Sequence, residues 1–274
     1  MRVAEPVFAP WRAELALGFE RREARTVLAE RRQDGPLVVQ KPLYPEGDEV
    51  CHAIVVHPPA GIAGGDELEV AAKAGAGAHA LLTTPGAAKW YRSAGPWARQ
   101  KLAFEVAGVL EWLPQETIVF DGALADMGCE VNLDAEACYI GWEILCLGRT
   151  GSGERFGRGE IRLHTRVSRG GRLLWYERGR IEGGGKLMHS PVGLDGRSVL
   201  GTLLAASVGL DSKLIAVYRA AAPETAITLL PGLLVARYLG NSSEEAKHCL
   251  ARVWSALRPA LTGREAVEPR IWRT

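Results

Sequence analysis

Short stretches of alternating apolar and polar residues, separated by tight turns, fill the first two-thirds of this chain. Leu15, Leu17 and Phe19 alternate with polar or small residues, and a turn-forming run such as Asp34-Gly35-Pro36 follows. A period of two is typical of a strand with one buried face, and the 32 glycines suit a fold with many tight turns. The pattern predicts a β-rich body over about residues 11–220, built as a sandwich, barrel or solenoid.

The last quarter has helical spacing instead. Pro231 can occupy the first turn of a helix that runs to Leu239. Ser242 and Glu245 have the spacing of a capping box, and apolar residues then recur every three or four positions. We expect this second helix to end before Pro259, because the residue before a proline disfavours the helical region.

Composition indicates a soluble, single-domain protein. The 274 residues are 47% hydrophobic and 24% charged, and we expect one domain over 1–274, with a helical portion at about 227–260 and a C-terminal tail. The net charge of +1 argues against nucleic acid and membrane partners, and no apolar run is long enough to span a bilayer. Five thinly spread cysteines and a first segment without signal-peptide pattern favour the cytoplasm.

The motifs of common enzymes are missing from the sequence. It has no G-x-S-x-G elbow and no phosphate-binding P-loop, and the spacing of its cysteines and histidines does not suit structural zinc. The glycine-rich stretch from Gly148 to Gly153 could hold an anion, so a small-molecule or nucleotide-binding enzyme stays open as an alternative. The sequence favours a binding or assembly protein that is not an enzyme.

Several loops have unusual composition. The stretch His57–Asp66 contains two prolines and three glycines, which fix one backbone path. A second loop carries Lys89, Tyr91 and Arg92, residue types enriched at interfaces, and we treat these three as a candidate interface loop. The aromatic and acidic segment Leu110–Glu116 is read as β-core aromatics with solvated charges.

At these loops the chain resembles the urease accessory protein family UreD, also called UreH, nearly from end to end. The matching motifs are Trp11, Thr26-Val27-Leu28, Gly35-Pro36-Leu37, Val39-Gln40-Lys41-Pro42-Leu43-Tyr44-Pro45-Glu46, Cys51-His52, His57-Pro58-Pro59, Gly61-Ile62, Gly64-Gly65-Asp66-Glu67-Leu68, Thr84-Pro85-Gly86-Ala87, Lys89, Tyr91-Arg92-Ser93, Leu110-Glu111-Trp112-Leu113-Pro114-Gln115, Leu145-Cys146-Leu147-Gly148-Arg149, Gly153-Glu154, Leu257-Arg258-Pro259, Leu261-Thr262-Gly263 and Pro269-Arg270-Ile271-Trp272. In one departure, Ala60 stands where the family usually has the first of two glycines.

The resemblance implies a mainly β fold, a β-helix-like body of many short strands with a small α-helical portion near the C-terminus. It also implies a urease maturation chaperone that binds apo-urease and recruits UreF and, through UreF, the GTPase UreG for nickel insertion. A 2:2 hetero-oligomer with UreF is implied as well. The chain itself would hydrolyse nothing.

For this family, a water-filled passage is thought to carry nickel toward urease. Four acidic residues of the region that resembles the family, Asp66, Glu67, Glu143 and Glu177, are the candidates for a transient nickel path. Nickel(II) in transit suits loosely held carboxylate, imidazole and water ligands, and we expect no tightly bound cofactor.

The C-terminal tail is the candidate contact for UreF. Arg270, Ile271 and Trp272 lie in it, and the two apolar residues look exposed in the sequence. A monomer would favour covering such residues, so a partner surface is predicted here.

Overall fold

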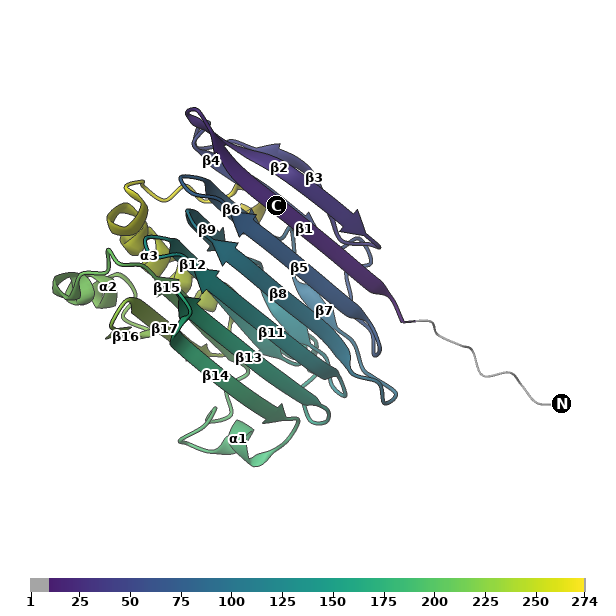
Figure 1. Cartoon of the computed structure of the whole chain (residues 1–274). Helices are drawn as coiled ribbons and strands as arrows, with labels where there is room; N and C mark the ends of the chain where they lie inside the picture. The colour runs from purple at the N-terminus through teal and green to yellow at the C-terminus, as the bar shows by residue number, and fades with distance from the viewer. Residues whose placement is uncertain (1–9, 274) are drawn as a thin grey trace.

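The computed structural model describes residues 10–273, which form two facing β-sheets with the two longer helices on one side (Figure 1). Sheet A contains, in spatial order, β14 (Arg172–Glu182), β13 (Glu160–Arg169), β11 (Leu124–Leu133), β8 (Ala98–Val106), β5 (Glu67–Ala74), β1 (Arg12–Arg22) and β2 (Arg25–Asp34). Sheet B contains β16 (Ala226–Leu230), β17 (Leu233–Gly240), β15 (Val199–Ala206), β12 (Cys138–Leu147), β9 (Val109–Trp112), β6 (His79–Thr83), β4 (Val50–Val56) and β3 (Val38–Leu43), and β10 (Thr117–Val119) pairs with β12 and with β7 (Ala88–Trp90). The helices are α1 (Lys186–His189), α2 (Ile215–Ala221) and α3 (Ser243–Thr262), with short 3₁₀ turns η1 (Thr150–Ser152), η2 (Ser212–Leu214) and η3 (Arg270–Arg273).

The chain winds between the two sheets. It runs from β4 in sheet B to β5 in sheet A, back to β6, then to β8, β9, β11, β12 and β13. Successive strands within each sheet of this winding pair in parallel. This confirms the expected mainly β fold with a β-helix-like body. Antiparallel hairpins, β1–β2 and β13–β14, form the two edges of sheet A.

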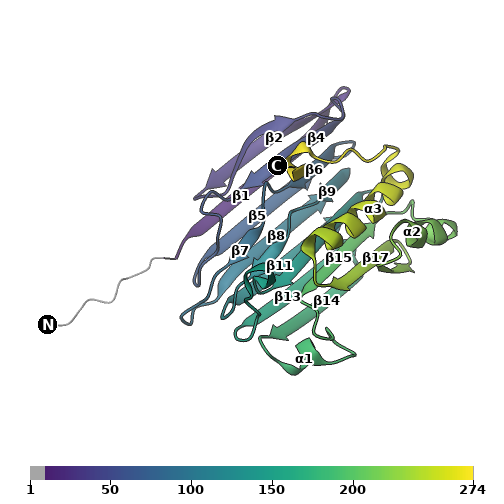
Figure 2. The same cartoon turned by 180° about the vertical axis from the view of Figure 1, so that it is seen from behind.

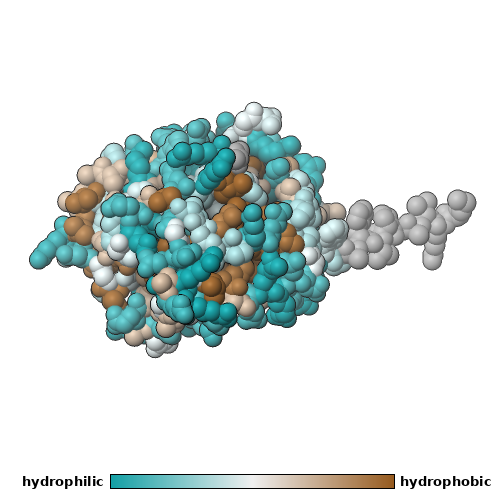
Figure 3. Space-filling model, turned by 90° about the horizontal axis from the view of Figure 1, so that it is seen from above, coloured by the Kyte–Doolittle hydropathy of each residue, from teal (hydrophilic) through white to brown (hydrophobic). Residues whose placement is uncertain are grey.

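The main core lies between the sheets. The register of sheet A places Leu15, Val70, Leu102 and Cys129 side by side, and the first three are buried. Alternation along β1 is confirmed, since Leu15, Leu17 and Phe19 point inward while their neighbours do not. Seen from above, polar residues cover most of the surface and apolar residues form separate groups (Figure 3).

Helix α3 covers the outer face of sheet B (Figure 2). Its Leu250, Val253, Trp254 and Leu257 are buried in a second apolar cluster that includes Trp142 of β12. The strands of sheet B beneath α3 are therefore buried on both faces.

This double burial explains one wrong prediction. Residues 231–239 do not form a helix, because strand β17 runs from Leu233 to Gly240. The region predicted as helical, about 227–260, therefore contains β16 and β17 as well as most of α3. Leu233 to Ala236 are all buried, so the strand has no alternation to distinguish it from a buried helix.

The second helix is confirmed, but its end is not where the sequence placed it. The Oγ of Ser242 accepts a hydrogen bond from the Glu245 N–H at 3.1 Å, as a capping box requires. The helix continues through Pro259 to Thr262 and ends at Gly263, whose φ is 71°. Pro259 removes one backbone hydrogen bond near the helix end, and the buried side chains of Leu257 and Arg258 hold the last turn in place.

A buried ionic network fastens α3 to sheet B. Arg258 donates from Nε to Glu111 at 3.0 Å and from Nη1 to Glu46 at 2.6 Å. His79 lies 2.6 Å from Glu111, and Trp254 also donates to this carboxylate. Burial alone would raise the pKa of Glu111, but the hydrogen bond from His79 and the charges of His79 and Arg258 lower it to about 2. The prediction that the charges of segment 110–116 are solvated is wrong for Glu111, which is fully buried.

Candidate functional site

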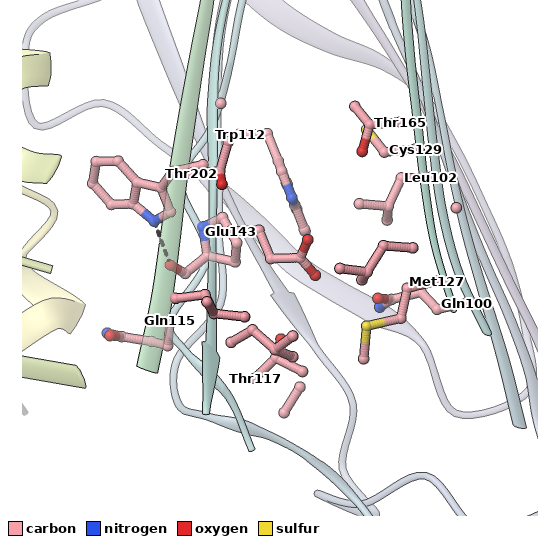
Figure 4. A pocket seen from close by; sticks show the side chains of 18 of the residues that line it. Gln100, Leu102, Trp112, Gln115, Thr117, Met127, Cys129, Glu143, Thr165 and Thr202 are labelled. Atoms are coloured by element: carbon pink, nitrogen blue, oxygen red, sulfur yellow. Dashed lines mark hydrogen bonds between the residues drawn. The ribbon is translucent and has the colours of Figure 1, made fainter. Parts of the chain in front are cut away.

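A cavity of about 580 Å³ lies between the two sheets. Sheet A contributes Gln100, Leu102, Met127, Cys129 and Thr165 to its wall, and Trp112, Glu143 and Thr202 of sheet B lie opposite (Figure 4). Loop residues that include Ala60, Gly86 and the almost fully exposed Val192 also line the cavity. The cavity therefore reaches the surface at the end lined by these loops, which we call its loop end.

The carboxylate of Glu143 points into this cavity (Figure 4). Strand β12 places Glu143 beside Thr202 of β15, and Thr202 lies beside Arg237 of β17, so one row of sheet B carries all three. Burial, and secondarily the charge of Glu177, raise the pKa of Glu143 to about 7. Among residues 10–273, Glu143 has no hydrogen-bond or ion-pair partner. It is therefore a carboxylate that protonates near neutral pH and is available to a ligand in the cavity.

Glu177 approaches the same space from sheet A. It pairs with Thr165 across the β13–β14 hairpin, and its Oε1 accepts a hydrogen bond from Nη2 of Arg237 at 2.7 Å. Both side chains are partly exposed at the open side of the cavity. The structure thus brings two of the four predicted path residues, Glu143 and Glu177, to one cavity.

The other two, Asp66 and Glu67, do not line this cavity. Asp66 accepts hydrogen bonds from the N–H groups of Trp11 and Ala63, at 3.1 and 2.8 Å, and so holds its own loop. Glu67 begins β5 on the outer face of sheet A, where it forms an ion pair with Arg99 at 3.2 Å. Alternation along β5 is the reason, because Leu68 takes the inward position next to Glu67.

The two loops singled out in the sequence meet at the loop end of the cavity. Ile62 donates to the carbonyl of Lys89 at 2.7 Å and accepts from the N–H of Tyr91 at 2.9 Å. Gly61 faces the Tyr91 ring so closely that an added Cβ would lie 2.0 Å from it. Ala60 has a φ of 59°, so the backbone keeps the left-handed conformation that glycine would favour.

Two further side chains of these loops face the cavity. His57 lines it, and burial lowers the pKa of His57 although the charge of Asp66 opposes this shift. A neutral imidazole can bind a metal ion. Lys89 also lines the cavity. The other two members of the candidate interface loop do not: Tyr91 packs edge-on against Phe120, and Arg92 is an exposed partner of Asp121.

The C-terminal tail folds back onto the chain, so the exposure predicted for it is wrong for Trp272. Its ring packs against Trp142 and Trp254, with centroid distances of 5.4 and 5.8 Å, and its Nε1 donates to Thr83 at 2.9 Å. Ile271 is likewise half-buried, whereas Arg270 is exposed. Trp272 therefore packs inside the folded chain, which its position near the end of the sequence does not predict.

The glycine-rich stretch from Gly148 to Gly153 uses three of its backbone N–H groups in hydrogen bonds within the chain. The N–H of Gly148 bonds to Val119, and those of Ser152 and Gly153 bond within the turn η1. Glu154 pairs with Arg149 at 2.7 Å. A phosphate cradle needs several free N–H groups, so these hydrogen bonds leave fewer groups in the loop to hold an anion.

Two further features are absent from residues 10–273. These residues contain no cluster of three or more His, Cys, Asp or Glu side chains arranged to hold a metal ion. None of their helices is both long and apolar enough to cross a membrane.

Sequence reasoning missed several cavity residues. Arg237 and Thr202 belong to the site only because β15 and β17 pair in register with β12. Cys129 is also on the wall, and burial and the nearby Glu143 raise the pKa of its thiol to about 12. Pairing between strands so far apart in the sequence leaves no local signal.

Comparison with known proteins gives a consistent result. Residues 12–273 match the sequence model of a family described as "UreD urease accessory protein". A protein of Azoarcus sp. (strain BH72) named "Urease accessory protein UreD" is 58% identical, over 96% of this chain and 94% of that protein. A protein of the same name from Dechloromonas aromatica (strain RCB) is 53% identical, over 99% of this chain and 98% of that protein. "Urease accessory protein UreD 2" of Pseudomonas syringae pv. syringae (strain B728a) is 50% identical, over 98% of this chain and 97% of that protein.

Proposed function

The chain belongs to the UreD family of urease accessory proteins, and from this membership we propose that it is a non-catalytic chaperone that passes nickel(II) through its inter-sheet cavity during urease maturation. A role in urease maturation follows from the family. The passage of nickel is the finer part of the proposal, and the observation that carries it is the unpaired Glu143 carboxylate in the cavity.

The chemistry of the cavity wall suits transient contact with a cation. Carboxylate, neutral imidazole and water are ligands that nickel(II) accepts, and Glu143, Glu177 and His57 line the cavity. Three ligands arranged around one point would trap the ion, whereas Glu143 and Glu177 approach from opposite sheets and no cluster of that kind exists within residues 10–273. The cavity volume of 580 Å³ also leaves room for water around an ion, since a water molecule takes about 30 Å³ in the liquid.

Proton exchange would accompany this passage. Because Glu143 has a pKa of about 7, it carries a proton part of the time at neutral pH. A divalent cation that binds the carboxylate displaces that proton, and the proton returns when the ion moves on. Competition between the proton and nickel(II) for the Glu143 carboxylate favours brief binding of the ion.

The proposal includes the partners implied by the family resemblance. The chain would bind apo-urease and UreF, and through UreF the GTPase UreG, in a 2:2 hetero-oligomer with UreF in the cytoplasm. The tail with Arg270, Ile271 and Trp272 would contribute to the UreF contact as a folded surface on α3. The loop with Lys89, Tyr91 and Arg92, at the mouth of the cavity, is the proposed second contact.

Nickel loading of urease tests the passage. Urease subunits and accessory proteins are co-expressed with Glu143→Gln, Glu177→Gln or both, and nickel per urease is measured after purification. Glu67→Gln is the matched control, because it makes the same change of charge outside the cavity. We expect less nickel with the cavity variants, unchanged co-purification of the accessory complex, and normal loading with the control. Full nickel content with the double variant would contradict the proposal.

A further inference from the structure

Strand β14 forms one edge of sheet A and pairs only with β13. Within residues 10–273, no strand pairs with its other side. A free edge exposes backbone N–H and C=O groups that can pair with another extended chain. The identity and spacing of these groups decide what kind of chain could bind.

The open groups belong to Tyr176, Arg178 and Arg180. In an antiparallel pair, residues alternate between those bonded to the partner strand and those turned away from it. The N–H of Gly183 bonds to the carbonyl of Gly159 at 3.0 Å, which sets the phase of this alternation. Every second residue from Gly183 therefore faces β13, and the three residues named here turn their N–H and C=O groups to the open side.

This open stretch has defined ends. The carbonyl of Glu182 already accepts a hydrogen bond from Gly185 at 3.0 Å. At the other end the register shifts between Val167 and Ser168 of β13, so regular pairing stops near Trp175. About five residues, 176–180, remain, which correspond to roughly 16 Å of strand.

The edge is positively charged. The β13–β14 hairpin, residues 160–182, contains six arginines and three glutamates, a net charge of +3 against +1 for the whole chain. Arg180 pairs with Glu160 and Glu182, whereas Arg178 has no ion pair among the described residues. Two copies joined through this edge would place arginines opposite arginines, which is unfavourable. An acidic partner strand could instead form ion pairs with Arg178, which has no such partner among the described residues.

The inner side of the edge fits small side chains. Gly179 lines the cavity, and the three atoms nearest to a Cβ built there belong to the side chain of Leu163, at 3.5 Å or more. Side chains of an added strand would alternate between this inner side and the outer face beside Arg178 and Arg180. An added strand would therefore fit best with apolar residues on its inner side and acidic residues on its outer side.

We propose that β14 is a docking strand, to which an extended segment of a partner protein with alternating acidic and apolar residues adds as a further strand of sheet A. Backbone hydrogen bonds to Tyr176, Arg178 and Arg180 hold the segment. Carboxylates on its outer side pair with the arginines, and its apolar side chains enter the space beside Gly179.

Fluorescence anisotropy with the full chain tests the docking strand. The probe is a dye-labelled eight-residue peptide of alternating glutamate and valine. Two further peptides carry N-methyl groups on one or the other alternate set of amides, and a fourth has lysine in place of glutamate. We expect binding of the probe, loss of binding for one methylated peptide only, and no binding of the lysine peptide. Equal affinities of the two methylated peptides, or equal binding of the lysine peptide, would overturn the proposal.

A pair of variants locates the site. Arg178→Glu is expected to weaken the probe about tenfold or more, because it places like charges together. Arg99→Glu makes the same change on the outer face of sheet A, three strands away from β14, and should leave the affinity nearly unchanged. Amide hydrogen exchange should show added protection of residues 176–180 when the probe is bound. Equal loss in both variants, or protection elsewhere only, would count against β14.

Discussion

Glu177 and Arg237 join the two sheets at the open side of the cavity, with Oε1 of the carboxylate 2.7 Å from Nη2 of the guanidinium. Glu177 belongs to the edge strand of sheet A, and Arg237 lies in the same row of sheet B as Glu143. The guanidinium therefore occupies the place beside Glu177 that a cation in the cavity would otherwise take.

Arg237→Gln should change nickel binding more than stability. Because both partners are partly exposed, the ion pair contributes only about 0.5–1 kcal/mol to the free energy of unfolding. Its removal frees Glu177 and takes a positive charge away from the cavity, so nickel(II) should bind more tightly in a calorimetric titration. Arg252→Gln, which breaks an exposed ion pair on α3, is the control for stability alone. Weaker nickel binding in Arg237→Gln would contradict this role.

Glu143→Gln should flatten the dependence of stability on pH. The pKa of Glu143 is raised to about 7 in the folded chain, from 4.5 for an ordinary glutamate, so the folded state holds the proton more tightly than the unfolded state. The folded chain is then favoured below about pH 4.5, and this stability is lost as the pH rises to about 7, by up to about 3 kcal/mol. Urea unfolding at pH 5 and pH 8 measures the effect. Glu143→Gln should lose less stability than the unchanged chain between these values, and identical losses would show that Glu143 does not titrate near neutrality.

The sequence indicated those strands that have one exposed face. The alternation of Leu15, Leu17 and Phe19 placed β1 correctly because the other side of that strand reaches solvent. Strand β17 escaped detection because sheet A lies over one face and α3 over the other, so that Leu233 to Ala236 are continuously apolar. Capping by Ser242 is a local interaction, and it was predicted correctly.

The candidate site was predictable only in part. Glu143 and Glu177 were found through the family resemblance, but their meeting with Arg237 depends on pairing between distant strands. Asp66 belongs to one of the matching motifs, and its carboxylate holds its own loop. A carboxylate in a motif has one of several structural roles, and only its neighbours in space distinguish them.

Arg258→Met should destabilise the chain strongly. The guanidinium is fully buried and compensates the carboxylates of Glu111 and Glu46. Loss of one partner leaves buried charge uncompensated, at a cost of about 3–5 kcal/mol. Arg252→Met is the matched control on the same helix, where the ion pair with Glu224 is exposed, and should cost less than about 1 kcal/mol. Urea unfolding gives both values, and similar values for the two variants would show that burial does not distinguish these pairs.

Ala60→Gly should stabilise the chain slightly. Ala60 has a φ of 59°, a conformation that costs a residue with a Cβ about 1–2 kcal/mol. Glycine removes that cost but loses about 0.5–1 kcal/mol because its unfolded state is more flexible. The balance is a gain of up to about 1 kcal/mol in the free energy of unfolding, measured with urea.

Gly61→Ala, at the neighbouring position, should destabilise the chain. In Gly61→Ala, the new Cβ would lie 2.0 Å from the Tyr91 ring, so the ring must move and give up its edge contact with Phe120. Overpacking of this kind costs about 1–3 kcal/mol. A gain of stability in Ala60→Gly together with a loss in Gly61→Ala would show that the two positions have different requirements. Position 60 needs a left-handed backbone conformation, and position 61 needs space for the Tyr91 ring. A loss of stability in Ala60→Gly would mean that the turn tolerates alanine without strain.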